Sequence, residues 1–242
     1  MNRCIVTYAA GAHEELLEVA LPTYRAFAER HRYDLHVGNK LTDLPPAWNK
    51  VPLLLCALQR YDEVVWFDCD LIVVDPTDDF PPIDKGNGRT YYHSLVRHFE
   101  DNSEVPNSGV WRLTKECVPL LEKLLELEVF RNHGWWEQAA LLTMMGYSVP
   151  PEGSHFPDTK CHNKCQTRWY LACNFMRLRW NSHPNYRAEN PRIVHCSYPQ
   201  MQQRLDVMRE LVRDPSYPYP RYDTTTEAKP VKQGKDGSDD TE

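Results

Sequence analysis

The chain has 242 residues and contains no run of eighteen apolar residues and no recognisable signal peptide. Met1, Asn2 and Arg3 precede only a short apolar stretch, which Gly11 and His13 interrupt. Such a stretch is too short to cross a bilayer and lacks the pattern of a cleaved leader. These absences predict a protein without a membrane span and favour a cytoplasmic location, or a form trimmed to its folded domain.

An excess of positive charge is also lacking, because 28 Lys and Arg residues face 34 Asp and Glu residues, which gives a formal net charge of −6. A general nucleic-acid-binding protein usually carries a basic face. The balance therefore argues against that class, although it does not exclude a local basic groove. Hydrophobic residues make up 41% and charged residues 26%, as in an ordinary globular protein of one domain.

A standard zinc-finger spacing is missing. Most of the eight cysteines fall within apolar segments and are predicted to be reduced core residues. The exception is Cys161-His162-Asn163-Lys164-Cys165, which no second Cys-x-x-Cys accompanies. We interpret this cluster as local structure, with zinc binding and a disulfide as alternatives.

Hydrophobic periodicity predicts alternating strands and helices. The predicted strands are 3–8, 34–37, 63–67, 90–96, 105–113 and 192–196, and the predicted helices are 14–30, 50–60, 114–130, 136–145 and 200–212. Pro22 is expected to kink or restart the first helix, Thr114 to cap the third, and Gly146 to end the fourth. Segments 150–164 and 169–178 read as loop and as mixed strand and loop. The alternation predicts an α/β domain with a mostly parallel central sheet flanked by helices.

The last twenty residues differ in composition from the rest. Residues 223–242 are rich in Thr, Lys, Gly and Asp and contain no aromatic side chain. Such a segment has no apolar surface to bury. We therefore predict one domain over residues 1–222 and a disordered tail over 223–242.

The most informative segment is 64–76, an apolar run that reads as one buried strand interrupted by Asp68 and Asp70. At i and i+2 of an extended chain these two carboxylates point to the same side, and Cys69 points to the other. Unpaired buried carboxylates are costly, whereas oxygen ligands suit a hard ion such as Mn²⁺ or Mg²⁺. The alternative is that both residues only end a strand before a turn.

Ligands of open α/β sheets bind beyond the carboxyl ends of the strands. Thr7, Tyr8 and Ala9 end the first strand and are therefore expected in that crevice, although a tyrosine there is also a common core residue. Lys50 begins the helix that leads into the Asp68 strand. It is a candidate for ligand binding, with a solvated lysine at a helix start as the alternative.

In this order, Lys50, helix 51–60 and residues 61–70 resemble the core of the GT-A glycosyltransferases. The likeness is greatest to the retaining galactosyl-, mannosyl- and xylosyltransferases and to the glycogenin-like group. The resemblance implies a single GT-A (Rossmann-like) domain whose Asp-x-Asp motif holds the metal of a nucleotide-sugar donor. It also places the nucleotide base, uridine or another, at Thr7, Tyr8 and Ala9, and the donor near Lys50.

Two later motifs occur in the order that this family shows. Asn107-Ser108-Gly109 is similar to its Asn-x-Gly motif, in which the glycine permits close approach and the amide can bond sugar hydroxyls. Glu137 and Gln138 resemble its Trp-x-(Asp/Glu)-Gln element, which implies that they lie beside the donor sugar and stabilise charge at the anomeric carbon. The alternatives are a turn before a strand, and a first-turn glutamate that complements the helix dipole beside two core tryptophans.

His195 closes the last predicted strand, after Arg179-Trp180-Asn181. The resemblance implies that this histidine is the third protein ligand of the metal, together with Asp68 and Asp70. The chain continues with Cys-Ser-Tyr-Pro, where the family has an aromatic residue and a Gly-containing turn. A histidine at the end of a strand is otherwise unremarkable.

Residues 81–104 match no family motif and are interpreted as a loop that meets the acceptor. Its polar and aromatic side chains are suited to a polar or anionic acceptor, with a tyrosine-rich surface loop as the alternative. These side chains are Arg89, Tyr91, Tyr92, His93, Arg97 and His98.

The sequence thus predicts a metal-dependent glycosyltransferase that moves a sugar from a nucleotide-diphosphate donor, UDP-linked, to a glycan or other hydroxyl-bearing acceptor. The resemblance implies retention of configuration. An inverting enzyme would need a carboxylate base, and Glu137 is the candidate. The alternatives are a sugar nucleotidyltransferase, whose basic Gly-rich first loop is not matched by Ala9-Ala10-Gly11-Ala12-His13, and a non-catalytic carbohydrate-binding relative.

Overall fold

The computed structural model describes residues 1–83, 89–100, 103–149, 162–163 and 165–221. The tail predicted at 223–242 lies outside these ranges, as do Cys161, Lys164 and most of the loop predicted at 150–164. The helices are α1 (Glu14–His31), α2 (Lys50–Leu58), α3 (Val118–Leu125), α4 (Trp136–Met144), α5 (Arg168–Leu171) and α6 (Met201–Arg213). The strands are β1 (Arg3–Thr7), β2 (Asp34–Val37), β3 (Glu63–Phe67), β4 (Leu71–Val73), β5 (His93–Glu100), β6 (Ser103–Thr114), β7 (Tyr147–Ser148), β8 (His162–Asn163), β9 (Cys173–Met176) and β10 (Ile193–His195).

The central sheet has six strands in the order β2-β1-β3-β6-β5-β9. Strand β1 pairs in parallel with β2 and β3, and β5 pairs in parallel with β9. Strand β6 runs antiparallel to both of its neighbours, β3 and β5. Away from this sheet, β4 pairs antiparallel with β10. The predicted α/β class with a mostly parallel central sheet is confirmed.

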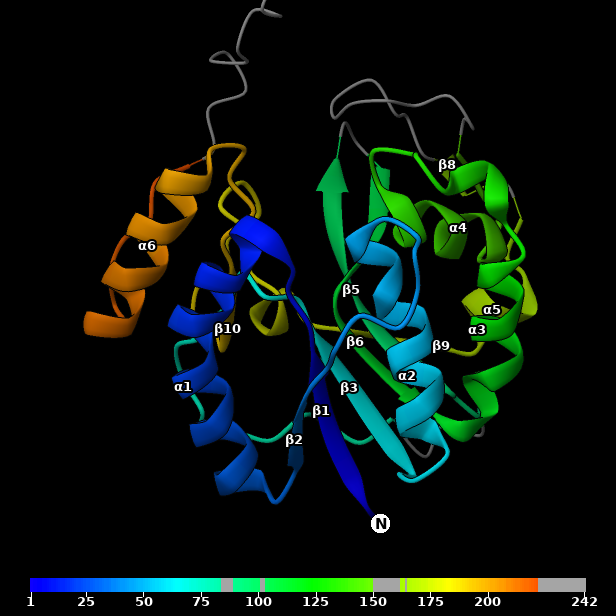
Figure 1. Ribbon diagram of the computed structural model, residues 1–242, viewed down its shortest axis with the longest axis horizontal. Helices are drawn as coiled ribbons and strands as arrows, with labels where there is room; N and C mark the ends of the chain where they lie inside the picture. The colour runs from blue at the N-terminus through cyan, green and yellow to red at the C-terminus, as the bar shows by residue number, and fades with distance from the viewer. Residues whose placement is uncertain (84–88, 101–102, 150–161, 164, 222–242) are drawn as a thin grey trace, which may run out of the picture.

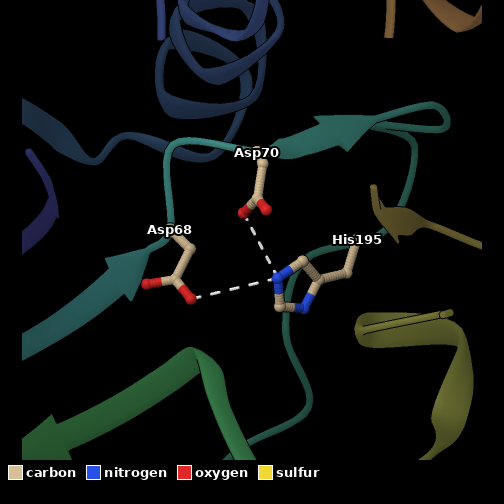
Figure 2. A group of neighbouring side chains, drawn as sticks. All are labelled: Asp68, Asp70 and His195. Atoms are coloured by element: carbon tan, nitrogen blue, oxygen red, sulfur yellow. Dashed lines mark ion pairs between the residues drawn. The ribbon is translucent and has the colours of Figure 1, made fainter. Parts of the chain in front are cut away.

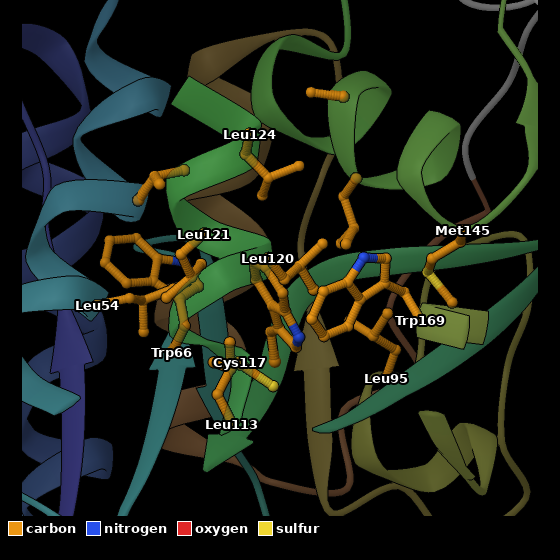
Figure 3. Packing of buried hydrophobic residues seen from close by; sticks show 14 of the residues in the cluster. Leu54, Trp66, Leu95, Leu113, Cys117, Leu120, Leu121, Leu124, Met145 and Trp169 are labelled. Atoms are coloured by element: carbon orange, nitrogen blue, oxygen red, sulfur yellow. The ribbon is translucent and has the colours of Figure 1, made fainter. Parts of the chain in front are cut away.

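Helices cover both faces of the sheet: α1 and α6 lie on one side, and α2, α3 and α4 on the other (Figure 1). Strand β3 is buried along its whole length because both faces are covered. Its side chains alternate, so Val64 and Trp66 join the core beneath α2 and α3 while Val65 and Phe67 join the core beneath α1 and α6. Figure 3 shows the first of these cores, where leucines of α3 pack above Trp66 and Leu113.

The segment predicted as one strand over 64–76 is two strands with a turn between them, so that prediction is wrong. Strand β3 ends at Phe67, and β4 begins at Leu71. The hydroxyl of Tyr24 donates to the carbonyls of Asp68 and Leu71, at 2.6 and 3.0 Å, and the N–H of Cys196 donates to the carbonyl of Asp70 at 2.8 Å. These bonds satisfy the turn's buried backbone, and the chain leaves the main sheet to pair with β10.

The helix predicted over 14–30 is present as α1 and continues through Pro22 without a restart, because Pro22 and Glu18, whose carbonyl loses its usual partner, both lie on the exposed face. The helix predicted over 114–130 is shorter: α3 begins at Val118, one residue before Pro119, which can only occupy a first turn. Thr114 makes no side-chain cap, and Val129, expected on the buried face, is 57% exposed.

The segment predicted as an acceptor loop is largely strand from residue 93 onward. Strand β5 occupies an interior place in the sheet, between β6 and β9. The segment 169–178, predicted as mixed strand and loop, contains most of α5 and all of β9. Across the described part of the chain, no helix has both the length and the apolar character needed to cross a membrane.

Candidate metal centre

Three side chains converge at the carboxyl end of β3. Asp68 directly follows β3, Asp70 directly precedes β4, and His195 ends β10 (Figure 2). The Nε2 atom of His195 lies 3.2 Å from Oδ1 of Asp70 and 4.0 Å from Oδ2 of Asp68. Within the described ranges, these three side chains form the group of acidic, His or Cys residues that could hold a metal ion, because their ligand atoms all lie within 4.8 Å of one another. The structure therefore brings together all three predicted metal ligands.

Each aspartate has one oxygen occupied by the protein and the other turned toward His195. Oδ1 of Asp68 accepts from the indole N–H of Trp66 at 2.6 Å and lies 3.1 Å from Nζ of Lys50. Oδ2 of Asp70 accepts from Nη1 of Arg204 at 3.0 Å. Burial opposes ionisation of Asp70, but the neighbouring His195 and Arg204 outweigh it and hold the pKa of that carboxyl well below its usual range. Both carboxylates are thus oriented as single-oxygen ligands.

The imidazole of His195 is oriented in the same way. Its Nδ1 atom lies 3.1 Å from Oδ1 of Asn181, which can only accept, so the hydrogen-bond network assigns the proton to Nδ1. With the ring neutral and its proton on Nδ1, Nε2 would offer its lone pair to a metal ion held between the two carboxylates. One nitrogen and two carboxylate oxygens form a donor set that suits Mn²⁺ or Mg²⁺ when other ligands come from phosphate and water.

Gly109 allows the His195 ring to occupy this place. A Cβ atom at residue 109 would lie 2.6 Å from Cε1 of His195 and 2.9 Å from Oδ1 of Asn107. That same Asn107 oxygen accepts from the N–H of Gly109 and from Nδ2 of Asn181, each at 2.8 Å. The close approach predicted for Gly109 is present, and its partner in this structure is the imidazole.

Lys50 is buried at the centre of an ionic network, so its reading as a solvated helix-start lysine is wrong. Its ammonium lies 2.6 Å from Oε1 of Glu137 and 3.1 Å from the hydroxyl of Ser108, in addition to its contact with Asp68. Burial on its own lowers the pKa of Lys50, but the carboxylates of Asp68 and Glu137 outweigh burial and raise that pKa above its ordinary value. Lys50 is therefore a permanent cation beside the candidate metal centre.

Glu137 and Gln138 contact the same network from the first turn of α4. The hydroxyl of Ser108 donates to Glu137 at 3.1 Å, and the N–H of Ser108 donates to Oε1 of Gln138 at 3.0 Å. Burial raises the pKa of Glu137, and Lys50 opposes this effect. Glu137 is thus a buried ion-pair partner and more than a complement to the helix dipole. Of the two neighbouring tryptophans, Trp135 is core, whereas Trp136 is 44% exposed with a φ of +43°.

Thr7, Tyr8 and Ala9 lie at the same edge of the sheet as Asp68, because Thr7 pairs with Phe67 in the β1–β3 ladder. Tyr8 and Ala9 are partly exposed, as expected for residues in a crevice. Thr7 is buried, and its hydroxyl has no hydrogen-bond partner among the described residues. The backbone N–H of Gly38 donates to the carbonyl of Thr7 at 2.8 Å and brings the loop after β2 to this edge.

The predicted acceptor contacts of His93 and His98 are wrong. Both imidazoles are buried and lie 2.8 Å from backbone carbonyls, those of Trp169 and Asn181 respectively. Burial lowers the pKa of His93 to about 4 and that of His98 to about 3, so both are neutral at pH 7. Through its contact with the Asn181 carbonyl, His98 helps to position Asn181, which in turn contacts His195 of the candidate metal centre. Arg97 pairs with Glu104 along the sheet.

The structure adds residues that sequence reasoning missed. Trp66 and Ser108 stood inside the quoted motifs, but nothing in the sequence says which side chain bonds to which. Arg204 comes from α6, far along the chain, and no motif marks it. His13 also lies near this site: partial burial and the positive charge of Arg204 lower its pKa. The Cys161 to Cys165 cluster falls largely outside the described residues, and Cys165 is exposed.

No protein-family model matches the chain, and no curated protein sequence matches it significantly. Solved structures do resemble it. A glycosyltransferase involved in the glycosylation of the major capsid of PBCV-1 superposes with a TM-score of 0.63 at 13% identity, over 87% of this chain and 100% of that one. The bifunctional glycosyltransferase WbbM superposes at 0.52 and 12% identity, over 88% and 50% of the two chains. The glycosyltransferase GlyE of Streptococcus pneumoniae TIGR4 superposes at 0.51 and 14% identity, over 91% and 66%.

At these identities the likeness establishes the fold. The chain has the GT-A fold that these glycosyltransferases share, which confirms the predicted fold class. The match covers the whole of the first of the three structures but only half of the second. The candidate metal centre lies where open α/β sheets bind ligands, beyond the carboxyl ends of parallel strands.

Proposed function

We propose that this protein is a metal-dependent glycosyltransferase that transfers a sugar from a nucleotide-diphosphate donor, UDP-linked, to a hydroxyl-bearing acceptor. The observation that carries the proposal is the convergence of Asp68, Asp70 and His195 at the ligand edge of a GT-A fold. Each of the three has its remaining polar atom held by a neighbouring side chain. A bound Mn²⁺ or Mg²⁺ would act as a Lewis acid toward the departing diphosphate.

The chain's own residues have separate tasks in this proposal. Tyr8 and Ala9 offer a partly exposed surface to the base beside the end of β1. Asn107 has its carbonyl oxygen engaged by Gly109 and Asn181, so its amide N–H groups are the donors that would orient sugar hydroxyls. Glu137 and Gln138 place a buried carboxylate and an amide near the same edge, where they would stabilise positive charge that develops on the sugar.

The burial and pairing of the Glu137 carboxylate support a retaining reaction over an inverting one. An inverting reaction needs a carboxylate free to accept a proton from the acceptor hydroxyl. In this structure the Glu137 carboxylate is buried and engaged by Lys50 and Ser108. A retaining reaction, with attack on the leaving-group face, needs no such base from the protein.

The test is release of UDP from a panel of UDP-sugars, with Mn²⁺ or with EDTA, using the wild type and the Asp70→Ala and Asp70→Asn variants. We expect UDP release only with the metal, and loss of at least 100-fold in either variant, because two-carboxylate sites depend on both ligands. Asp62→Ala is the matched control, since Asp62 precedes β3 at the opposite edge of the sheet and is half exposed.

The alternatives predict different products. A sugar nucleotidyltransferase would release pyrophosphate from a nucleoside triphosphate and a sugar 1-phosphate, with little UDP from the panel. A binding relative would bind sugars without turnover. Wild-type activity that persists in EDTA, or an Asp70→Ala variant as active as Asp62→Ala, would refute the metal mechanism.

A further inference from the structure

Both aspartates of the metal centre are already paired with protein cations. Lys50 lies 3.1 Å from Asp68, and Arg204 lies 3.0 Å from Asp70. Lys50 also neutralises part of Glu137. Three carboxylates and two cations leave the immediate site with a single net negative charge. A bare divalent cation therefore enters a site whose carboxylate charge is largely compensated, and it lies close to two fixed positive charges that repel it.

Arg204 has more N–H donors than its hydrogen bonds within the protein use. Its guanidinium carries five N–H groups, of which Nε–H donates to the carbonyl of Tyr198 and one on Nη1 donates to Asp70. Among the described residues, the structure gives its other N–H groups no acceptor. The side chain is 21% exposed, whereas that of Asp70 is 8% exposed. Arg204 is thus the more exposed member of its pair with Asp70.

Resting on the function proposed above, we propose that Arg204 binds the donor's diphosphate and opposes entry of the metal ion without it. A diphosphate brings the negative charge that the site lacks, and a guanidinium recognises phosphate oxygens through paired N–H groups. The ion and the diphosphate then bind as one unit. Arg204 keeps Asp70 oriented and disfavours the bare ion, so the complex of metal and nucleotide is the form that the site accepts.

Loss of Arg204 should weaken binding of UDP but should not weaken binding of Mn²⁺ alone. In Arg204→Met, calorimetric titration of UDP at saturating Mn²⁺ should show roughly 10- to 100-fold weaker binding, the size expected for loss of hydrogen bonds to a charged group. Titration of Mn²⁺ alone should show affinity that is unchanged or higher, because a repelling charge has gone. Arg204→Lys keeps the charge and loses the paired geometry, so Mn²⁺ alone should bind as in the wild type and UDP with intermediate affinity.

Arg209→Met is the matched control. Arg209 lies on the same helix, carries the same charge and pairs with Glu15 at the surface, where its side chain is 50% exposed. It should change neither titration. Melting temperatures would confirm that all variants are folded.

Two results would overturn the inference. Equal UDP affinity in Arg204→Met and the wild type would show that Arg204 does not contact the diphosphate. A parallel loss of affinity for Mn²⁺ alone and for UDP would show that Arg204 only positions Asp70. Failure of the proposed function itself looks different, since the wild type would then bind no UDP with either Mn²⁺ or Mg²⁺.

Discussion

Gly109 shows how one atom can decide whether the metal centre forms. It lies on β6, next to the carboxyl end of β3, and the His195 ring fills the space where a side chain would be. The obstacle to a Cβ atom is the imidazole together with the Asn107 amide oxygen. Because Asn107 is itself fixed by Asn181, neither neighbour can yield without disturbing the ligand geometry.

We predict that Gly109→Ala weakens Mn²⁺ binding at least 10-fold while it lowers the free energy of unfolding by only about 1–3 kcal/mol, the usual cost of overpacking. The methyl group would displace the His195 ring from its place beside Asp70. Calorimetric Mn²⁺ titration and denaturant unfolding measure the two effects. His195→Ala gives the comparison, because both changes remove the same ligand. Wild-type metal affinity in Gly109→Ala would show that His195 is not a ligand.

The sequence allowed the candidate ligands to be predicted, but not their partners. Two carboxylates in a buried run are conspicuous because such groups are costly without a cation, whereas His195 was indicated only by the resemblance to the GT-A family. The sequence does not indicate that Lys50 and Arg204 pair with these aspartates, since lysines and arginines at helix positions are usually solvated. Only the packing of α2 and α6 against the sheet reveals that both are committed to the aspartates.

At the scale of elements, the buried Lys50 joins three separate segments. It begins α2, its partner Glu137 lies in the first turn of α4, and Ser108 lies on β6. None of these segments is adjacent in sequence. A buried ion pair contributes little net stability compared with apolar packing, but removal of one partner leaves an uncompensated charge.

We predict that Lys50→Met lowers the free energy of unfolding by about 3–5 kcal/mol. The double variant Lys50→Met/Glu137→Gln should recover part of this loss, since the stranded carboxylate is gone. The control is Lys115→Met, whose partner Asp62 is at the surface, with an expected change below about 1 kcal/mol. Urea unfolding measures all three. Equal effects of the Lys50 and Lys115 changes would contradict the buried network.

Element prediction was good where periodicity was strong and poor where tertiary contacts decide. Helix α1 and strands β1 and β3 were found because their apolar patterns are long and regular. The turn at 68–70 was given only as an alternative because Tyr24 and Cys196, remote in sequence, satisfy its backbone. Strand β5 was shortened and displaced because its histidines resemble surface residues, although their burial makes them core.

At the scale of the whole molecule, two of the buried histidines, His93 and His98, make stability depend on pH. His93 and His98 have folded pKa values of about 4 and about 3, below the ordinary value of about 6.5 that they regain on unfolding. A depressed folded pKa means that the unfolded chain binds more protons. The stabilising contribution is thus complete above about pH 6.5 and declines as the pH falls toward the folded pKa.

We predict that each of these histidines costs about 2 kcal/mol of unfolding free energy when the pH falls from about 7 to 5. His98→Gln should remove about half of their joint pH dependence, whatever it does to stability at pH 7. The measurement is a set of urea unfolding curves at pH 7, 6 and 5. An unchanged slope in His98→Gln would show that His98 is not buried as a neutral group.

The residues of the candidate metal centre are also synthesised at different times. Asp68 and Asp70 leave the ribosome early, whereas Arg204 follows Asp70 by 134 residues. At about 5–20 residues per second, the two carboxylates wait roughly 7 to 27 seconds for Arg204. Lys50, made before either aspartate, is the cation available during that interval. Because β10 and α6 must arrive and dock before His195 and Arg204 reach Asp70, capture of the ion would report that the nascent domain is complete.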